Sequence, residues 1–377
     1  MHKTSAWPLS QAYVALIIYA SLYPFTGWRD QGIAPWAFLY SPLPKYWTGF
    51  DVAANAGGYV PLGFLMALSF LRRGGGTPQR PAASRAAAIS VAVLTAAVLS
   101  LSMEALQTYL PSRVPSNVDF ALNAAGALAG AVLAGVLEWA GYIDRWSRFR
   151  VRWFVEDARG ALVLLALWPV ALLFPAAVPL GLGQVFERLE MALTDWLLDT
   201  PFLEWLPVRD VELQPLVPGV ELVCVALGAL VPCLLGYSVI RSAARRAVFA
   251  AAAVAVGVSA TALSAALSWG PDHAWAWLSL PVQLGLLVAL LLGLMLLAVP
   301  PRGCAALVLL ALMLHLSLLN QAPASTYFTQ TLQTWEQGRF IRFHGLVQWL
   351  GWVWPYVVLL YVLLRVSRAD QQNTMGS

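Results

Sequence analysis

The sequence predicts an all-α integral membrane protein, a polytopic bundle of about ten transmembrane helices. Of its 377 residues, 59% are hydrophobic and only 11% are charged, and the mean hydropathy is +0.68. Soluble domains carry about 25% charged residues. The apolar runs are about 20 residues long and lack the period-two alternation of barrel strands. Because only helices and closed barrels satisfy the backbone in lipid, we expect the spans to be helices.

Ten apolar runs are long enough to be predicted as spans. In chain order they cover 8–26, 52–71, 86–108, 119–140, 160–180, 218–240, 247–268, 279–300, 303–321 and 345–364. Three cysteines lie within these runs without the spacing of metal ligands, so we expect small core residues rather than a metal or redox site. They are Cys224, Cys233 and Cys304.

The distribution of Lys and Arg predicts the orientation, because cytoplasmic loops of membrane proteins are rich in these residues. With a cytoplasmic N-terminus, 16 of the 23 basic residues fall on the inside. The long outside segment 181–217 is acidic. We therefore expect both termini to be cytoplasmic.

Two further segments have amphipathic patterns. Residues 145–157 interleave arginines with aromatic residues, which is typical of a cytoplasmic helix on anionic lipid rather than of nucleic-acid binding. Residues 184–199 indicate an interfacial helix on the outer side or, alternatively, a loop packed on the bundle. The predicted organisation is a four-span domain, a basic linker, a six-span domain and a disordered tail, at 1–141, 142–159, 160–368 and 369–377.

The most informative acid is Glu104, which lies inside the outer end of the third span among Leu101, Met103 and Leu106. A charged group within a membrane is costly and usually functional. Gln107, one turn later, shares its helix face.

The loop that follows contains Arg113, and Ser116 or Asn117 is positioned to cap the fourth span. Asp119 lies in the first turn of that span and Asn123 one turn deeper, as Asp51 and Asn55 do in the second span. Both spans begin with the pattern D-x-x-x-N-x-(A/G)-G, which indicates either two related hairpins or a shared preference at helix starts.

These groups lie at similar depth, so they can converge on one pocket that opens to the outer face. In that case Glu104 is a candidate general acid or base and Asp119 its ionised partner. The candidate substrate-binding residues are Asp51, Asn55, Gln107, Arg113, Ser116 and Asn123. The structural alternative makes the two aspartates helix-dipole charges, the amides interhelical contacts and Arg113 the ion-pair partner of Glu104.

The order of these residues resembles the VanZ-like family. The resemblance covers about residues 10–140 and is carried by Asp51-x3-Asn55, Pro61-Leu-Gly63-Phe, Ser102-x-Glu104-x2-Gln107 and Arg113-x2-Ser116-x2-Asp119-x3-Asn123-x2-Gly126-x3-Gly130. Members are bacterial membrane proteins named for one linked to teicoplanin resistance. The resemblance implies a role in the bacterial envelope and a place in the cytoplasmic membrane, but it supplies no chemical mechanism. The six-span part resembles no family.

The second part offers weaker candidates. Arg339, Arg342 and His344 lie in a predicted outer segment where they could bind a phosphate or another anion. His315 has the pattern of a buried, hydrogen-bonded side chain.

Three functions fit the sequence. They are an enzyme acting on a lipid-linked or glycan substrate, a non-catalytic binder of such an envelope lipid or precursor, and a transporter or flippase. The last is disfavoured because no acid lies in mid-membrane. The sequence does not identify a cofactor, and no nucleic-acid partner is expected. The oxygen-rich cluster could alternatively hold Mg²⁺ or Ca²⁺.

Overall fold

The computed structural model describes residues 6–23, 25–43, 49–72, 82–206, 213–323 and 341–374. In these ranges the chain forms twelve α-helices and four short 3₁₀ helices, with one isolated β-bridge between Phe154 and Ile240 and no sheet. The predicted all-α class is confirmed. The chain divides into two compact units, Met1–Arg150 and Val151–Ser377.

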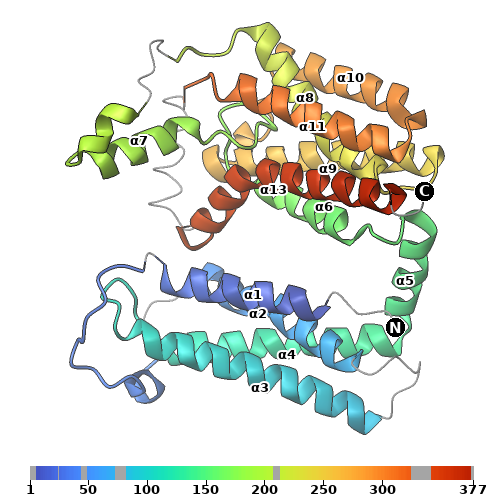
Figure 1. The fold of residues 1–377 in the computed structure, drawn as a ribbon. Helices are drawn as coiled ribbons and strands as arrows, with labels where there is room; N and C mark the ends of the chain where they lie inside the picture. The colour runs from blue at the N-terminus through green and yellow to red at the C-terminus, as the bar shows by residue number, and fades with distance from the viewer. Residues whose placement is uncertain are drawn as a thin grey trace. The chain divides into compact units, whose positions relative to one another are not determined.

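The first unit is built from four helices that lie alongside one another (Figure 1). They are α1 (Ala6–Leu22), α2 (Gly49–Leu71), α3 (Ala82–Gln107) and α4 (Asn117–Trp139), with a 3₁₀ helix η1 (Ala37–Tyr40) between α1 and α2. Ser116 caps α4, because its hydroxyl oxygen accepts from the backbone N–H groups of Val118 (3.2 Å) and Asp119 (3.4 Å).

Helices α2 and α4 pack more closely than any other pair described, and small residues allow this. A Cβ atom on Gly63 would lie 2.8 Å from the Cα of Ala127, and one on Gly130 would lie 2.8 Å from the carbonyl carbon of Val60. Gly126 approaches the backbone of Ala56 in the same way. The two helices that carry the repeated D-x-x-x-N pattern are therefore in backbone contact.

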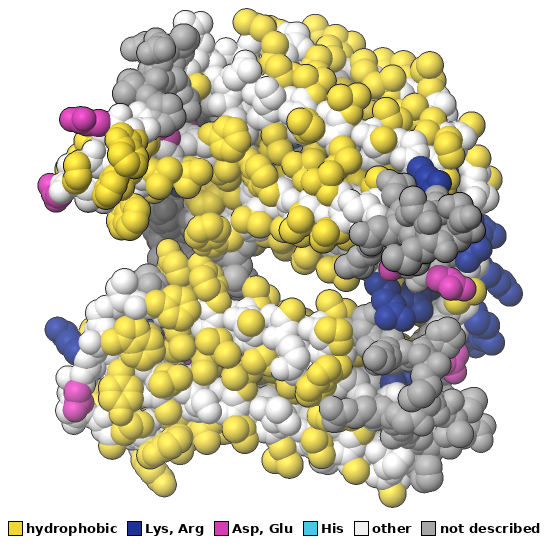
Figure 2. Space-filling model, viewed as in Figure 1, with side chains coloured by type: hydrophobic (Ala, Val, Ile, Leu, Met, Phe, Trp, Pro, Cys, Tyr) yellow, Lys and Arg dark blue, Asp and Glu magenta, His cyan; other side chains and the backbone are white. Residues whose placement is uncertain are grey.

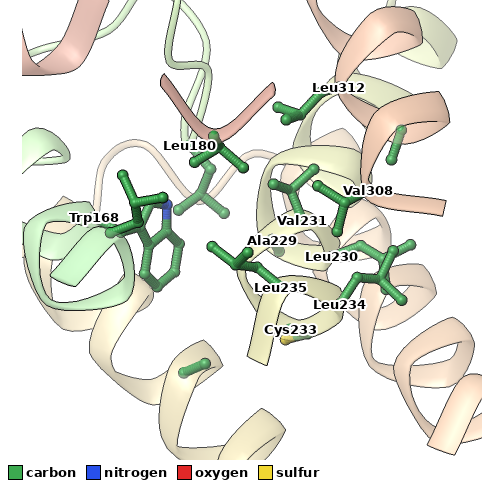
Figure 3. Packing of buried hydrophobic residues seen from close by; sticks show 14 of the residues in the cluster. Trp168, Leu180, Ala229, Leu230, Val231, Cys233, Leu234, Leu235, Val308 and Leu312 are labelled. Carbon is green, nitrogen blue, oxygen red and sulfur yellow. The ribbon is translucent and has the colours of Figure 1, made fainter. Parts of the chain in front are cut away.

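The second unit surrounds α8 (Pro218–Tyr237), whose C-terminal half is almost wholly buried. Its core includes Trp168 of α6, Val231 and Leu235 of α8, and Val308 and Leu312 of α11 (Figure 3). The other helices of this unit are α6 (Arg159–Ala171), α7 (Phe186–Leu197), α9 (Ala243–Trp269), α10 (Leu280–Met295), α11 (Pro301–Leu319) and α13 (Ile341–Thr374). The 3₁₀ helices are η2 (Pro201–Trp205), η3 (Pro271–His273) and η4 (Leu296–Ala298).

Eight helices in the described part are long and apolar enough to cross a membrane. They lie at Val52–Leu71, Ala83–Gln107, Asn117–Trp139, Pro218–Tyr237, Ala243–Trp269, Leu280–Ala298, Pro301–Leu319 and Val347–Ser367. Large apolar side chains are exposed along them, such as Leu94 in α3 and Leu310 in α11. Hydrophobic side chains cover much of the face shown in Figure 2. The chain is a multi-pass helical membrane protein.

The two remaining predicted spans correspond to shorter apolar helices. Helix α1 has 17 residues where 8–26 was expected, and α6 has 13 where 160–180 was expected. Helix α6 contains Pro169 and ends at Ala171, and the next prolines, Pro175 and Pro179, lie in a stretch without helix. Proline removes a backbone donor and clashes with the preceding turn, which explains why the apolar run does not continue as helix.

Both amphipathic segments are helical. Helix α5 (Tyr142–Trp153) carries the arginines of the basic linker and has no buried residue, and Figure 2 shows Lys and Arg side chains gathered in its region. Helix α7 occupies the segment for which a helix or a packed loop was expected, and it also has no buried residue. At the C-terminus, α13 extends to Thr374, into the stretch 369–377 that was expected to be disordered.

Candidate functional site

A buried polar cluster lies where α3 ends and α4 begins. Glu104 of α3 is 4% exposed, Asn123 of α4 is 6% exposed, and Tyr59 of α2 is 5% exposed. Ser100, one turn before Glu104, is fully buried. Three helices thus bring one carboxyl, one amide and two hydroxyl groups together inside an apolar bundle, where unpaired polar groups are costly.

Glu104 is tied to the start of α4. Its Oε2 atom accepts a hydrogen bond from the backbone N–H of Ser116, at 2.9 Å. Since Ser116 is also the cap of α4, the carboxyl holds the α3–α4 turn in a fixed position. The predicted proximity of Glu104 and Ser116 is therefore present in the structure.

Amide side chains link the three helices. Asn55 of α2 donates to Asp119 Oδ1 of α4, with 2.6 Å between the two atoms. Asn123 donates to the Ser100 hydroxyl oxygen, at 3.0 Å. A hydrogen bond to a carboxylate is charge-assisted and stronger than one between neutral groups, so Asn55 and Asp119 form the stronger of the two links.

Two atoms of the cluster have no hydrogen-bond partner within the part of the chain that the structure describes: the Tyr59 hydroxyl and Asn123 Oδ1. The Tyr59 hydroxyl lies beside the side chains of Ser100, Glu104 and Tyr13. Buried polar groups are nearly always paired, so each exception calls for an explanation.

Gln107 and Arg113 donate hydrogen bonds to the C-terminal end of α1. The Gln107 amide donates to the carbonyl oxygen of Ser21 at 3.1 Å. The Arg113 guanidinium donates to the carbonyl oxygens of Ala20 (3.2 Å) and Tyr23 (2.8 Å). A cation at a helix C-terminus satisfies its last carbonyls and complements the helix dipole, so these contacts have a structural role.

The opposite end of α2 and α4 carries the ion pairs found between described residues. Arg72 contacts Glu138 at 2.9 Å and Asp144 at 2.8 Å. Burial lowers the pKa of the Arg72 guanidinium, but its hydrogen bonds to Asp144 and Glu138 raise the pKa by more, and the net shift is upward. Arg72 is therefore a firmly charged link between α2, α4 and α5.

Four other predicted site residues lie wholly or partly outside the part of the chain that the structure describes. Arg339 and the side chains of Asp51, Arg342 and His344 are not among the described groups. Among the side chains that are described, no three of the types His, Cys, Asp and Glu come together in a way that would hold a metal ion.

Two buried polar residues of the second unit form hydrogen bonds to backbone groups of other segments. His315 is buried, with Nδ1 at 3.1 Å from the carbonyl oxygen of Cys224, as expected for a hydrogen-bonded core side chain. Asn320 accepts from the N–H groups of Val185 and Phe186 and donates to the carbonyl oxygens of Gly183 and Leu316. The three cysteines are buried, as predicted.

Sequence reasoning missed two members of the cluster, Ser100 and Tyr59. Both were signalled by helical spacing: Ser100 lies four residues before Glu104, and Tyr59 lies four residues after Asn55. Residues four apart on a helix are neighbours, so each shares a face with a residue that the sequence analysis had selected.

Comparison with known families supports the resemblance seen in the sequence. Residues 3–138 match the VanZ/LLP1 family model, a range that includes the whole cluster. Comparison with curated proteins gives no significant match. Comparison with solved structures gives none either. The first unit of this membrane protein, over residues 3–138, is a VanZ/LLP1 family domain.

Proposed function

We propose that the VanZ/LLP1 domain binds a hydroxyl-bearing envelope ligand, a glycan or a lipid-linked glycan, at the buried polar cluster. The observation that carries the proposal is the pair of unpartnered buried atoms, the Tyr59 hydroxyl and Asn123 Oδ1, beside Glu104. The amide oxygen can only accept a hydrogen bond, while the phenol can donate or accept. A ligand hydroxyl, which also does both, satisfies each of them.

Glu104 decides whether this site is catalytic. As an enzyme, the domain would use Glu104 as general acid or base, with Asp119 as the ionised partner that Asn55 orients. As a binder, it would use the same carboxyl only as a hydrogen-bonding group for an envelope lipid or precursor. The transporter alternative needs a charge relay across the bilayer. Glu138 lies at the far end of α4 and is already paired with Arg72, which does not favour such a relay.

The proposed setting is the cytoplasmic membrane of a bacterium, with the cluster near the outer face. It rests on the excess of basic residues in the segments predicted to be inside, which places both termini in the cytoplasm. In this orientation α1 and α6 complete ten crossings. A protein that binds a lipid-linked glycan would contribute to glycopeptide tolerance, because glycopeptides act on cell-wall precursors of this kind.

The test is Glu104→Gln, because glutamine preserves the shape and can still accept from the Ser116 N–H. We expect the purified variant to keep its melting temperature in detergent while teicoplanin tolerance of expressing cells falls. Asn117→Ala is a matched control at the same end of the unit, since the Asn117 side chain bonds only the Ser41 carbonyl among described partners. This control should leave tolerance unchanged.

A second measurement separates enzyme from binder. Binding of a polyprenyl-diphosphate disaccharide should persist in Glu104→Gln in both cases, but turnover should fall about a hundredfold or more only in an acid–base enzyme. A destabilised Glu104→Gln protein, or a stable one with full tolerance, would contradict the proposed site.

A further inference from the structure

The second unit contains a cavity of about 430 Å³ that plays no part in the proposed function of the first. It lies where α6 ends, α8 begins, α9 ends and α10 begins. Pockets that bind small ligands have volumes of about 300–1,000 Å³. The polar and aromatic residues used below, all from its lining, are Glu221, Thr261, Ser264, Ser279, Trp269 and Trp277.

The wall on the α6 side is a buried segment without helical structure. After α6 ends, Phe174 and Leu180 are each only 3% exposed, and Leu180 has a positive φ of 61°. Irregular backbone at membrane depth is tolerated only where protein buries it or where it lines a cavity. Helices broken in this way often mark binding sites in membrane proteins. The buried irregular segment after α6 is therefore a backbone feature of the kind that lines ligand sites in membrane proteins, and here it forms one wall of the cavity.

The polar atoms that line the cavity are mainly acceptors. The Ser264 hydroxyl already donates to the carbonyl oxygen of Leu173, and the Thr261 hydroxyl to that of Gly257, both at 2.9 Å. The indole N–H of Trp277 donates to the carbonyl oxygen of Ala274, also at 2.9 Å. Hydroxyl lone pairs and the Glu221 carboxylate are the acceptors that the lining offers to a ligand.

The charge of the lining is negative, which suits a donor ligand in the same way as the acceptor atoms do. Among the described residues of the lining, Glu221 is the one ionisable side chain, and none is Lys, Arg or His. The Ser279 hydroxyl lies 3.5 Å from Glu221 Oε1, a long contact that leaves the carboxylate available to a stronger donor. Two indole rings complete the polar side, and indole faces attract cations. The rest of the lining is apolar, from residues such as Leu172, Ala176 and Ala265.

We propose that this cavity binds the ammonium group of an amphipathic amine. The carboxylate, the hydroxyl oxygens and the indole faces would hold the ammonium, and the apolar lining would hold the attached chain. A neutral polyol could donate to the same oxygens but would leave the Glu221 charge without a counter-ion. The amine has two possible sources, an amino headgroup of a membrane lipid or a water-soluble amine.

The experiment uses the purified full-length protein in detergent after delipidation, with binding followed by native mass spectrometry and by melting temperature. The lipid probes are phosphatidylethanolamine and phosphatidylglycerol with the same acyl chains, and the soluble probes are hexylamine and hexanol. We expect at least one amine to bind about tenfold or more tightly than its matched partner without an amine. Glu221→Gln should weaken amine binding about ten- to a hundredfold, since a charge-assisted hydrogen bond is lost.

Two variants control for indirect effects. Glu204→Gln removes an exposed acid of the same unit that does not line the cavity, and it should leave binding unchanged. Ala265→Leu adds volume inside the cavity while keeping Glu221, and it should abolish amine binding. The Ala265 variant also tests the site independently if Glu221→Gln fails to fold.

The outcomes are distinct. Preference for phosphatidylethanolamine alone identifies a lipid headgroup site, and preference for hexylamine alone identifies a site for soluble amines. Equal binding of each amine and its matched partner would overturn the proposal, and so would amine binding that persists in Ala265→Leu or in a folded Glu221→Gln. Glycan binding in the first unit can fail or succeed without affecting any of these results.

Discussion

Replacing Gly130 with alanine tests the close contact between α2 and α4. The added Cβ atom would lie 2.8 Å from the carbonyl carbon of Val60 and 2.9 Å from the backbone N of Phe64. Ordinary contacts between heavy atoms are about 3.5–4.0 Å. The helices must therefore separate by about 1 Å, because backbone atoms cannot move aside as a flexible side chain can.

The expected cost follows from this overpacking. Forcing a methyl group into a well-packed contact costs about 1–3 kcal/mol. The separation would also stretch the 2.6 Å hydrogen bond between Asn55 and Asp119, so the polar cluster should lose part of its order. Gly57→Ala is the matched control on α2, since nothing lies within 4 Å of a Cβ atom there. In that variant, loss of a helical glycine should stabilise by about 0.5–1 kcal/mol.

The assay is thermal unfolding of both variants in the same detergent, followed by circular dichroism. The Gly130 variant should melt below the parent protein and the Gly57 variant at or above it. Equal melting temperatures for the two variants would refute the argument, because they would mean that α2 and α4 do not touch at this glycine.

Three further predictions concern other parts of the chain. Asn320→Ala should destabilise the protein by about 1–3 kcal/mol, because the half-buried backbone N–H groups of Val185 and Phe186 lose their acceptor, whereas Gln321→Ala, at an exposed position, should be neutral in the same melting assay. Arg72→Gln should cost about 1 kcal/mol at low salt, and the loss should shrink as salt is raised; a loss independent of salt would contradict an ionic role. Cysteine placed at Gln214 should react with an impermeant reagent added outside intact cells and cysteine at Arg80 should not, and the reverse pattern would invert the proposed topology.

Much of the architecture could be predicted because lipid imposes strong constraints on sequence. Apolar runs of span length located eight helices long enough to span and the two shorter helices α1 and α6. The capping pattern offered Ser116 or Asn117, and Ser116 is the cap. The length of α6 could not be read from hydropathy, because a proline-containing apolar run looks the same whether it is helical or irregular and buried. Helix α6 ends at Ala171, four residues before Pro175, and the irregular segment that follows lines the cavity.

The candidate site was only partly predictable for a different reason. Helical spacing placed Glu104, Asn55, Asp119 and Asn123 correctly at one end of the first unit. It could not show that Gln107 and Arg113 turn to α1, since those partners lie 86 and 93 residues earlier in the chain. Periodicity describes which residues share a face, but the neighbour of that face depends on tertiary packing.

The contacts at the end of α1 have a consequence for biogenesis. Helix α1 is synthesised before the side chains that satisfy its last carbonyl groups, since Gln107 and Arg113 follow 86 or more residues later. At translation rates of about 5–20 residues per second, this interval is on the order of 5–20 seconds. During that time the end of α1 must find its hydrogen bonds in water or in the insertion machinery. We therefore expect the end of α1 to form its final hydrogen bonds only after the α3–α4 turn has been synthesised.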